Sequence, residues 1–175
     1  MSCWKRGFDI IFAILIVTFS FIPLIIIGIL IKIFDRGDII FWSTRVGRNN
    51  KSFEMPKFRT MRSGAPIVAT DDLDDPNQWI TPLGYYLRKT SIDELPQLWS
   101  ILKGDMSFVG PRPALVSEKK LINIRTEKMI HTLVPGLTGL AQVNGRDEIS
   151  VLQKANYDLK YYEDLSLLLD MKIIL

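Results

Sequence analysis

The sequence predicts an α+β fold that is mostly helical, with one helix embedded in a membrane. Three observations carry this prediction. Residues 10–31 form an apolar run that carries no charge. Two short runs that contain aromatic and β-branched residues, 39–43 and 52–55, flank a turn at 47–51, and this pattern predicts a β-hairpin. Later apolar residues recur mostly at helical spacing, as in 151–162, which predicts amphipathic helices.

The apolar run is long enough to cross the hydrocarbon of a bilayer as a helix. It is too long for a signal peptide, and no small-residue cleavage site follows it. A core helix that is apolar on every side would be unusual in so small a domain. The run therefore predicts a membrane helix.

Two details bear on how this helix meets the membrane. Pro23 lies in the middle of the run, where it removes a backbone hydrogen bond and bends a helix. Basic residues flank both ends, with Lys5 and Arg6 before the run and Lys32 and Arg36 after it. Positive charge marks the cytoplasmic side, and a spanning helix should show it at one end. A re-entrant helix that bends and returns to the same face explains both details, and a spanning helix stays open as the alternative.

The segment 88–98 contains the strongest candidate for a reactive site. Asp93 and Glu94 follow a basic pair and precede an apolar helix, and Pro96 suits the first turn of that helix. Ser91 with Glu94 fits a capping box, which is a complete structural explanation of the pattern. The functional alternative is that these carboxylates act on a phosphorylated lipid or nucleotide, because basic residues and glycine loops crowd the chain around them.

Several cations are candidates for contacts with phosphate. Lys57 and Arg59 alternate with apolar residues, which predicts either an edge strand with a basic face or a phosphate-facing rim. Arg112 lies between two prolines, so a stiff backbone would present its guanidinium for a bidentate grip on phosphate. Residues 136–147 carry closely spaced glycines that could cradle an anion and include Arg146. The loop matches neither a Walker A nor a Rossmann fingerprint.

The rest of the chain predicts a polar loop and further helices. The acidic run 71–75 belongs to a loop at 63–77 and lacks the glycine and glutamate of an EF-hand. Trp99, with Lys103 nearby, is a pairing typical of a membrane interface, although a buried helix face would look the same. The expected helices are 83–89, the segment after Pro96 with the apolar stripe Leu95, Leu98, Trp99 and Leu102, 114–134 and 151–162.

Composition excludes some classes of site. The 175 residues suffice for one domain with a hydrophobic core, and the net charge of +3 says little about partners. The single cysteine, Cys3, excludes an internal disulfide and suits a reducing compartment. The single histidine, His131, argues against a histidine metal cage or a Ser-His-Asp triad.

Several long motifs occur in a fixed order along nearly the whole chain. With them the sequence resembles the bacterial sugar transferases, and more narrowly the small monotopic phosphoglycosyl transferases that start glycan assembly on undecaprenyl phosphate. The motifs are Lys-Phe-Arg-Thr-Met (57–61), Asp-Glu-Leu-Pro-Gln-Leu (93–98), Leu-Lys-Gly-Asp-Met-Ser-Phe-Val-Gly-Pro-Arg-Pro (102–113), Pro-Gly-Leu-Thr-Gly-Leu-Ala-Gln-Val-Asn-Gly-Arg (135–146) and Leu-Leu-Asp-Met-Lys (168–172).

The resemblance implies an architecture. Residues 1–36 would form a re-entrant helix that anchors a catalytic domain, 37–175, on the cytoplasmic face of the bacterial inner membrane, with amphipathic helices at the membrane surface. Family members break the helix at a Ser-Pro pair, whereas here Ile22 precedes Pro23. The family's continuation beyond the Leu-Asp-Met-Lys motif is missing, so we expect the C-terminal end to be truncated.

The resemblance also implies a reaction. Asp93 would attack the β-phosphate of a UDP-sugar, release UMP and carry the sugar phosphate until undecaprenyl phosphate takes it. Glu94 would bind the metal or manage protons, and Mg²⁺, held by Asp93 and Glu94, is the expected ion. Arg88, Arg112 and Arg146 are expected to clamp phosphate. Lys57, Arg59 and Asp158 are further substrate-binding candidates, and Asp170 is a weaker one.

Other readings stay open. A catalytically silent membrane module that binds nucleotide sugars is the alternative from another class, and a hexose-1-phosphate transferase is the nearest competitor among enzymes. The pattern suggests an N-acetylated deoxysugar and a role in capsule, O-antigen or glycoprotein glycan assembly. Nucleic acid is not an expected partner, and the oligomeric state is open, with a homodimer as one possibility.

Overall fold

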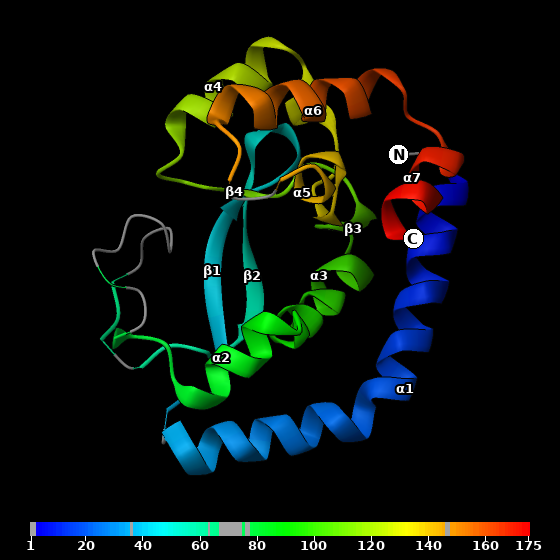
Figure 1. The fold of residues 1–175 in the computed structure, drawn as a ribbon. Helices are drawn as coiled ribbons and strands as arrows, with labels where there is room; N and C mark the ends of the chain where they lie inside the picture. The colour runs from blue at the N-terminus through cyan, green and yellow to red at the C-terminus, as the bar shows by residue number, and fades with distance from the viewer. Residues whose placement is uncertain (1–2, 36, 63, 67–74, 76–77, 146–147) are drawn as a thin grey trace.

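The computed structural model describes residues 3–35, 37–62, 64–66, 75, 78–145 and 148–175, and it confirms a mostly helical α+β fold (Figure 1). Its elements are α1 (Cys3–Asp35), β1 (Ile40–Val46), the 3₁₀ helix η1 (Arg48–Asn50), β2 (Ser52–Phe58), α2 (Pro82–Lys89), the 3₁₀ helix η4 (Ile92–Gln97), α3 (Leu98–Lys103), β3 (Ser107–Val109), β4 (Ala114–Leu115), α4 (Lys119–Glu127), the 3₁₀ helix η5 (Ile130–Thr132), β5 (Gly136–Thr138), α5 (Leu140–Val143), α6 (Val151–Glu163) and α7 (Leu167–Ile174).

Helix α1 is bent into two arms that both pack against the rest of the protein (Figure 1). Pro23 lies inside the helix, where its missing N–H and its ring favour a bend. In the first arm, Arg6 donates to the carbonyls of Ile101 and Leu102 at the end of α3, at 2.5 and 2.7 Å. In the second arm, Ile31 is fully buried in a cluster with hydrophobic residues of β2 and α2. Both ends of α1 therefore lie against the same globular domain.

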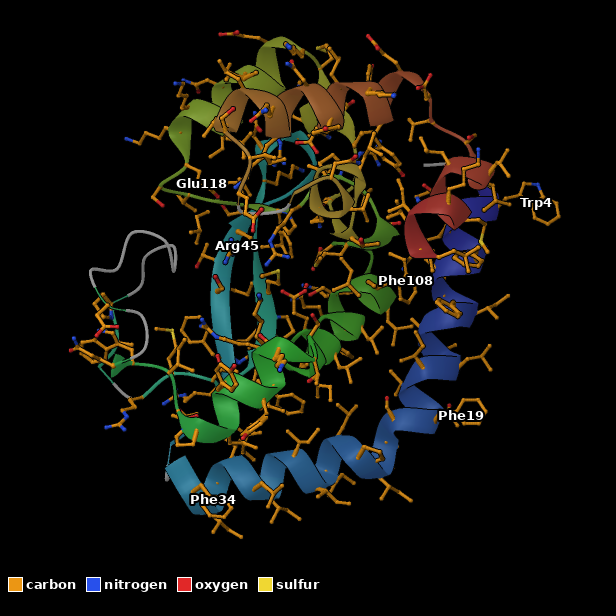
Figure 2. All side chains as sticks on the ribbon, viewed as in Figure 1. Trp4, Phe19, Phe34, Arg45, Phe108 and Glu118 are labelled. Carbon is orange, nitrogen blue, oxygen red and sulfur yellow. The ribbon has the colours of Figure 1, made fainter. Side chains whose placement is uncertain are left out.

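The opposite face of α1 has no cover within the described residues. Phe19 is 83% exposed and Phe34 is 71% exposed. Figure 2 shows both side chains pointing away from the protein. Within the described part of the chain, Cys3–Phe34 is the one helix long and apolar enough to cross a membrane. Its length and composition therefore suit insertion into a bilayer.

The predicted hairpin is confirmed, and its strands are longer than expected. β1 and β2 pair antiparallel from Ile40 opposite Phe58 to Val46 opposite Ser52. Pro56 fits inside β2 because β2 is an edge strand of the sheet order β2-β1-β4. At the turn, Asn49 adopts a left-handed φ of 56°, which asparagine tolerates better than most residues.

The predicted helix over 114–134 is wrong. Ala114 begins the short strand β4, which pairs with Val46 of β1, so the chain is extended where helix was expected. α4 then spans only Lys119–Glu127. Met129 follows with a left-handed φ of 59°, which ends the helix before η5. Sheet pairing with a distant strand thus overrides the local helical spacing.

A second, parallel pair of strands explains the closely spaced glycines. β3 and β5 pair parallel, and the backbone of Gly110 lies against Gly136 and Gly139. A Cβ added at Gly136 would lie 2.1 Å from the Gly110 nitrogen, and one at Gly139 would lie 2.1 Å from the Gly110 oxygen. These glycines allow two backbone segments to touch, a role different from the predicted anion cradle.

The main hydrophobic core lies between the first arm of α1, the hairpin and α3. Met55, Ile101, Met106 and Phe108 are buried there. α6 closes the upper part of the fold in Figure 1, and its expected span is confirmed. A capping box between Ser150 and Gln153 fixes the start of α6. The core thus joins the first arm of α1 to the elements that carry the site.

Candidate active site

The turn before α3 presents the two acids, but not through a capping box. Ser91 has a left-handed backbone, with φ 56° and ψ 15°, and its side chain makes no cap hydrogen bond. An N-cap needs an extended backbone for its side chain to reach the helix amides, so the predicted capping box between Ser91 and Glu94 is wrong. The chain continues as the 3₁₀ helix η4, which includes Pro96 and turns both Asp93 and Glu94 inward.

Asp93 and Glu94 are buried side by side at the wall of a cavity of about 620 Å³. We call it the central cavity. Elements distant in sequence build it, because the hairpin, α2, η4, the loop after β3 and α5 each contribute side chains. Its wall consists of Phe41, Ser43, Arg45, Lys57, Phe58, Arg59, Thr60, Met61, Arg62, Gly64, Ala65, Pro66, Arg88, Asp93, Glu94, Arg112, Pro113, Ala114, Leu115, Glu118, Leu121, Arg125, Ala141, Gln142 and Lys154.

Glu94 is held between two cations. Its Oε1 accepts from Lys57 Nζ at 2.8 Å and from Arg112 Nη2 at 3.0 Å. Burial alone would raise the pKa of Glu94, but the charges of Arg112 and Lys57 outweigh it and lower the pKa to about 2. Glu94 is therefore a fixed anion that orders the two cations.

Asp93 has a different environment. Among the ion pairs within the described ranges, none involves Asp93. Burial raises the pKa of Asp93; the charge of Glu94 acts in the same direction, and those of Lys57 and Arg88 oppose it. A carboxylate that is partly stripped of water and carries no salt bridge suits a nucleophile.

Cationic groups surround the acids from several elements. Lys57 comes from β2, Arg88 from α2 and Arg112 from the loop between β3 and β4. Burial lowers the pKa values of both Lys57 and Arg88. Arg88 Nε donates to Thr60 Oγ1 at 2.9 Å, which fixes its direction. Such a cluster of partly buried cations is suited to binding the oxygens of a phosphate group.

The structure brings together six of the residues singled out from the sequence and separates others from them. Lys57, Arg59, Arg88, Asp93, Glu94 and Arg112 all line the central cavity. Arg59 also pairs with Asp38 at 3.2 Å. Arg146 lies outside the described residues, so its place stays a prediction.

Two acidic candidates lie elsewhere. Asp158, on α6, is absent from the wall of the central cavity and pairs with Arg125 at 2.6 Å. Asp170, on α7, pairs with Lys5 at 2.5 Å and accepts from the hydroxyl of Tyr161 at 2.6 Å. Asp158 thus forms an ion pair between α6 and α4, and its predicted contact with substrate stays a prediction. Asp170 joins α7 to the start of α1.

Sequence reasoning missed Arg45. This residue lies on β1, two residues after Ser43 and four after Phe41. Alternate residues of a strand share a face, so all three side chains face the cavity. Its Nε donates to Ser43 Oγ at 3.0 Å, and no salt bridge among the described residues neutralises it. Burial and then the charge of Arg112 lower the pKa of Arg45 to about 10. The alternation along β1 was the available signal, but the predicted strand stopped too early.

The two acids of the cavity are suited to a magnesium ion whose other ligands are water and phosphate oxygens of a substrate. Within the described part of the chain, no group of three or more His, Cys, Asp and Glu side chains forms a self-contained metal site. Mg²⁺ does not need one, since it commonly binds through one or two carboxylates, water and substrate phosphate. Asp93 and Glu94 supply that number of carboxylates in one place.

Comparison with known proteins gives a consistent result. The family model for bacterial sugar transferases matches residues 1–175. The chain is 37% identical to the exopolysaccharide production protein ExoY of Sinorhizobium fredii, over 97% of this chain and 81% of that protein. It is 37% identical to the UDP-glucose:undecaprenyl-phosphate glucose-1-phosphate transferase of Escherichia coli, and 41% identical to the galactosyl transferase CpsE of Streptococcus agalactiae. The match covers 97% and 91% of this chain but only 38% and 39% of these longer relatives.

Proposed function

The chain belongs to the bacterial sugar transferase family, and from that premise we propose that it transfers a sugar 1-phosphate from a UDP-sugar to undecaprenyl phosphate. The name of the relative from Escherichia coli describes this kind of reaction. The observation that carries the proposal is Asp93, a buried carboxylate without a salt bridge among the described residues, in a cavity lined by cations. An uncommitted carboxylate next to phosphate-binding groups is what phosphoryl transfer through a covalent intermediate requires.

In the first proposed step, an oxygen of Asp93 attacks the β-phosphorus of the UDP-sugar. The bond from that phosphorus to the bridging oxygen breaks, and UMP leaves with the electron pair. The product on the enzyme is an acyl phosphate, a mixed anhydride that carries the sugar. In the second step, an oxygen of undecaprenyl phosphate attacks the same phosphorus, the carboxylate of Asp93 leaves, and undecaprenyl diphosphate sugar is formed. The reaction is thus divided into two displacements at one phosphorus.

The cations and Glu94 have separate roles in this proposal. Lys57, Arg88 and Arg112 neutralise phosphate oxygens, so that an anionic nucleophile can approach an anionic substrate. Arg45 extends this cationic wall along β1 and is a further candidate for a contact with the donor. Glu94 keeps Lys57 and Arg112 in place through its two ion pairs.

We propose Asp93 and Glu94 as the residues that would hold Mg²⁺. When bound, the ion supplies positive charge to phosphate oxygens of the donor. The cations of the cavity supply the remaining positive charge, and the low exposure of Asp93 limits the approach of water to the acyl phosphate. Removal of Mg²⁺ with EDTA should abolish UMP release, and added Mg²⁺ should restore it.

We propose that α1 is re-entrant and that the catalytic domain lies on the cytoplasmic face of the inner membrane. The two ends of α1 both contact the domain, through Arg6 and Ile31. Basic residues on both flanks favour the cytoplasmic side for each end. The exposed apolar face of the helix would contact lipid, which would place the domain where a lipid phosphate can reach it.

The identity of the sugar stays a prediction. The sequence pattern suggested an N-acetylated deoxysugar, whereas the names of relatives refer to glucose and galactose. Capsule, O-antigen and glycoprotein glycan assembly are all pathways that begin with such a transfer, and a homodimer stays one possible state of assembly.

A screen of UDP-sugars tests the proposed function. The purified protein in detergent, with undecaprenyl phosphate and Mg²⁺, should release UMP from one donor class, and Asp93→Asn should lower that turnover about a thousandfold or more. N-acetylated deoxysugars and hexoses should be compared in the same assay. Absence of UMP release with every donor would favour the silent-module alternative, and unchanged turnover by Asp93→Asn would exclude the nucleophile.

A further inference from the structure

The loop that carries Arg112 is held by its carbonyl groups. Pro111 and Pro113 flank Arg112 and have no backbone N–H to donate. The carbonyl of Pro111 accepts from the Gly136 nitrogen at 3.0 Å. The carbonyl of Arg112 itself accepts from Arg125 Nη1 at 2.8 Å. Side-chain or backbone donors from other elements therefore determine where this stretch of backbone lies.

Arg125 is in turn oriented by Asp158. Both Nε and Nη2 of Arg125 donate to Asp158 Oδ2, at 2.9 and 2.6 Å. The two side chains are 11% and 2% exposed, so little water competes for these bonds. With Nη1 on the Arg112 carbonyl, every nitrogen of this guanidinium has a partner within the protein. Arg125 reaches the cavity wall, but its donors point at Asp158 and at the backbone.

These contacts form a continuous path to the acids. Asp158 on α6 orients Arg125 on α4, Arg125 holds the Arg112 carbonyl, and Arg112 Nη2 reaches Glu94 Oε1 at 3.0 Å. We propose that Arg125 and Asp158 are positioning residues, which act on the reaction by holding the Arg112 backbone so that its guanidinium faces Glu94 and the phosphate of the donor. The proposal rests on the proposed function for the role of Arg112.

A purely structural role for the Arg125–Asp158 ion pair would not explain why a buried ion pair is present rather than an apolar one. A buried ion pair loses much of its Coulomb energy to desolvation, and apolar side chains of similar size often give equal or greater stability. The end of α4 is also joined to α6 at the surface, where Nζ of Lys128, the residue after α4, donates to Asn156 Oδ1 at 3.0 Å. The contact of Arg125 with the Arg112 carbonyl gives the buried pair a function that an apolar pair could not perform.

The test is a double-mutant cycle between this pair and Arg112. Arg125→Met with Asp158→Leu replaces the ion pair by apolar contact and removes the donor to the Arg112 carbonyl. In the wild-type background this paired change should lower kcat/KM for the UDP-sugar about tenfold or more. In an Arg112→Ala background it should change kcat/KM less than about twofold, because the group that it positions is gone. Thermal unfolding of the paired variant should stay within a few degrees of wild type, about what a neutral replacement gives.

Lys128→Gln is the matched control, since it weakens a second polar contact between the end of α4 and α6 without touching Arg112. It should leave kcat/KM unchanged. Equal losses of kcat/KM in both backgrounds would overturn the proposal, as would a loss of the same size in Lys128→Gln. If the paired variant does not fold, Arg125→Lys takes its place, because it keeps the charge beside Asp158 and loses the forked geometry.

Calorimetric binding of UMP, measured through the same cycle, separates this proposal from the proposed function. If the wild-type protein binds UMP but never releases UMP from a UDP-sugar, the proposed function is contradicted. The double-mutant cycle measured by UMP binding then still tests whether Arg125 and Asp158 position Arg112. If the wild-type protein releases UMP from a UDP-sugar and the effects of the paired change and of Arg112→Ala are additive, only the positioning proposal is contradicted.

Discussion

The carboxyl groups of Asp93 and Glu94 are neighbours in the chain and line the same cavity, yet their pKa values are shifted in opposite directions. Burial raises the pKa of Asp93, whereas Arg112 and Lys57 overcome the burial of Glu94 and lower its pKa to about 2. Paired groups with separated pKa values commonly have different roles in a reaction. Here Glu94 Oε1 takes both cations, Lys57 and Arg112, and Asp93 is available to a substrate.

The ion pairs of Glu94 predict a pH-dependent stability. The pKa of Glu94 is lower in the folded protein than its ordinary value of 4.5, so the unfolded chain binds the proton more readily. The stabilisation is fully present above pH 4.5 and is lost as the pH falls toward 2. Glu94→Gln should lower the free energy of unfolding by up to about 3 kcal/mol at pH 7, and by less at pH 3.

Urea unfolding in detergent at both pH values measures this difference. Glu54→Gln is the control, because Glu54 is exposed and hydrogen bonds with Thr44 rather than with a cation. An equal loss of stability in Glu94→Gln at pH 7 and pH 3 would show that the two ion pairs do not hold this carboxylate.

The position of Arg45 predicts that its replacement raises the stability of the protein and lowers its activity. Arg45 is a partly buried cation without a salt bridge among the described residues. Burial and the charge of Arg112 lower its pKa to about 10, even though the charges of Glu118 and Glu94 act in the opposite direction. Arg45→Met should raise the free energy of unfolding by about 1–2 kcal/mol. The same change should lower kcat/KM for the donor about tenfold or more, because an anion contact is lost.

Urea unfolding and UMP release measure the two effects of Arg45→Met. Arg48→Met, which removes an exposed arginine bonded to the Thr132 carbonyl, should leave kcat/KM unchanged. A variant Arg45→Met that is less stable and fully active would assign Arg45 to the framework of the hairpin.

The glycines of β5 predict a large effect on folding. Gly136→Ala would place a methyl group 2.1 Å from the Gly110 nitrogen, so the two backbone segments must separate. We expect a loss of about 3 kcal/mol or more in the free energy of unfolding. Gly7→Ala, with no atom within 4 Å of its added Cβ, should be neutral or stabilising by up to about 1 kcal/mol. A stable Gly136→Ala protein that fails only to bind UMP would support the predicted anion cradle instead.

The bend of α1 predicts that both of its ends face the cytoplasm. Cys3 is the only cysteine of the chain and is exposed, so it reports on one end. Asp38→Cys in a Cys3→Ser background reports on the other, because the Asp38 side chain is 83% exposed. A maleimide that does not cross membranes should label both positions in inverted vesicles and neither in intact spheroplasts. Labelling of the two positions from opposite sides would mean a spanning helix.

Local patterns in the sequence predicted much of the fold. The uncharged run 10–31 predicted α1, alternation around a turn predicted the hairpin, and helical spacing predicted α6. These features depend on neighbouring residues, so a single sequence contains them. The bend at Pro23 could also be expected, since proline removes a hydrogen bond wherever it lies in a helix.

Contacts between distant segments were not predictable in this way. Ala114 forms a strand only because β1 lies beside it, and Ser91 is left-handed because the chain turns sharply there. The partner of Asp158 is Arg125, 33 positions away on another helix, and no local pattern joins them. The local sequence singled out Asp93 and Glu94 and the family resemblance implied their roles, while the structure supplied the difference between their environments.

The central claim is that Asp93 carries the sugar phosphate during the reaction. Intact-protein mass spectrometry after brief exposure to the UDP-sugar and Mg²⁺, without undecaprenyl phosphate, tests it most directly. We predict added mass equal to one sugar phosphate, located at Asp93 by peptide mapping, lost when undecaprenyl phosphate is added and absent from Asp93→Asn. An enzyme that releases UMP with no adduct at this residue, together with an Asp93→Asn variant that keeps its turnover, would contradict the account.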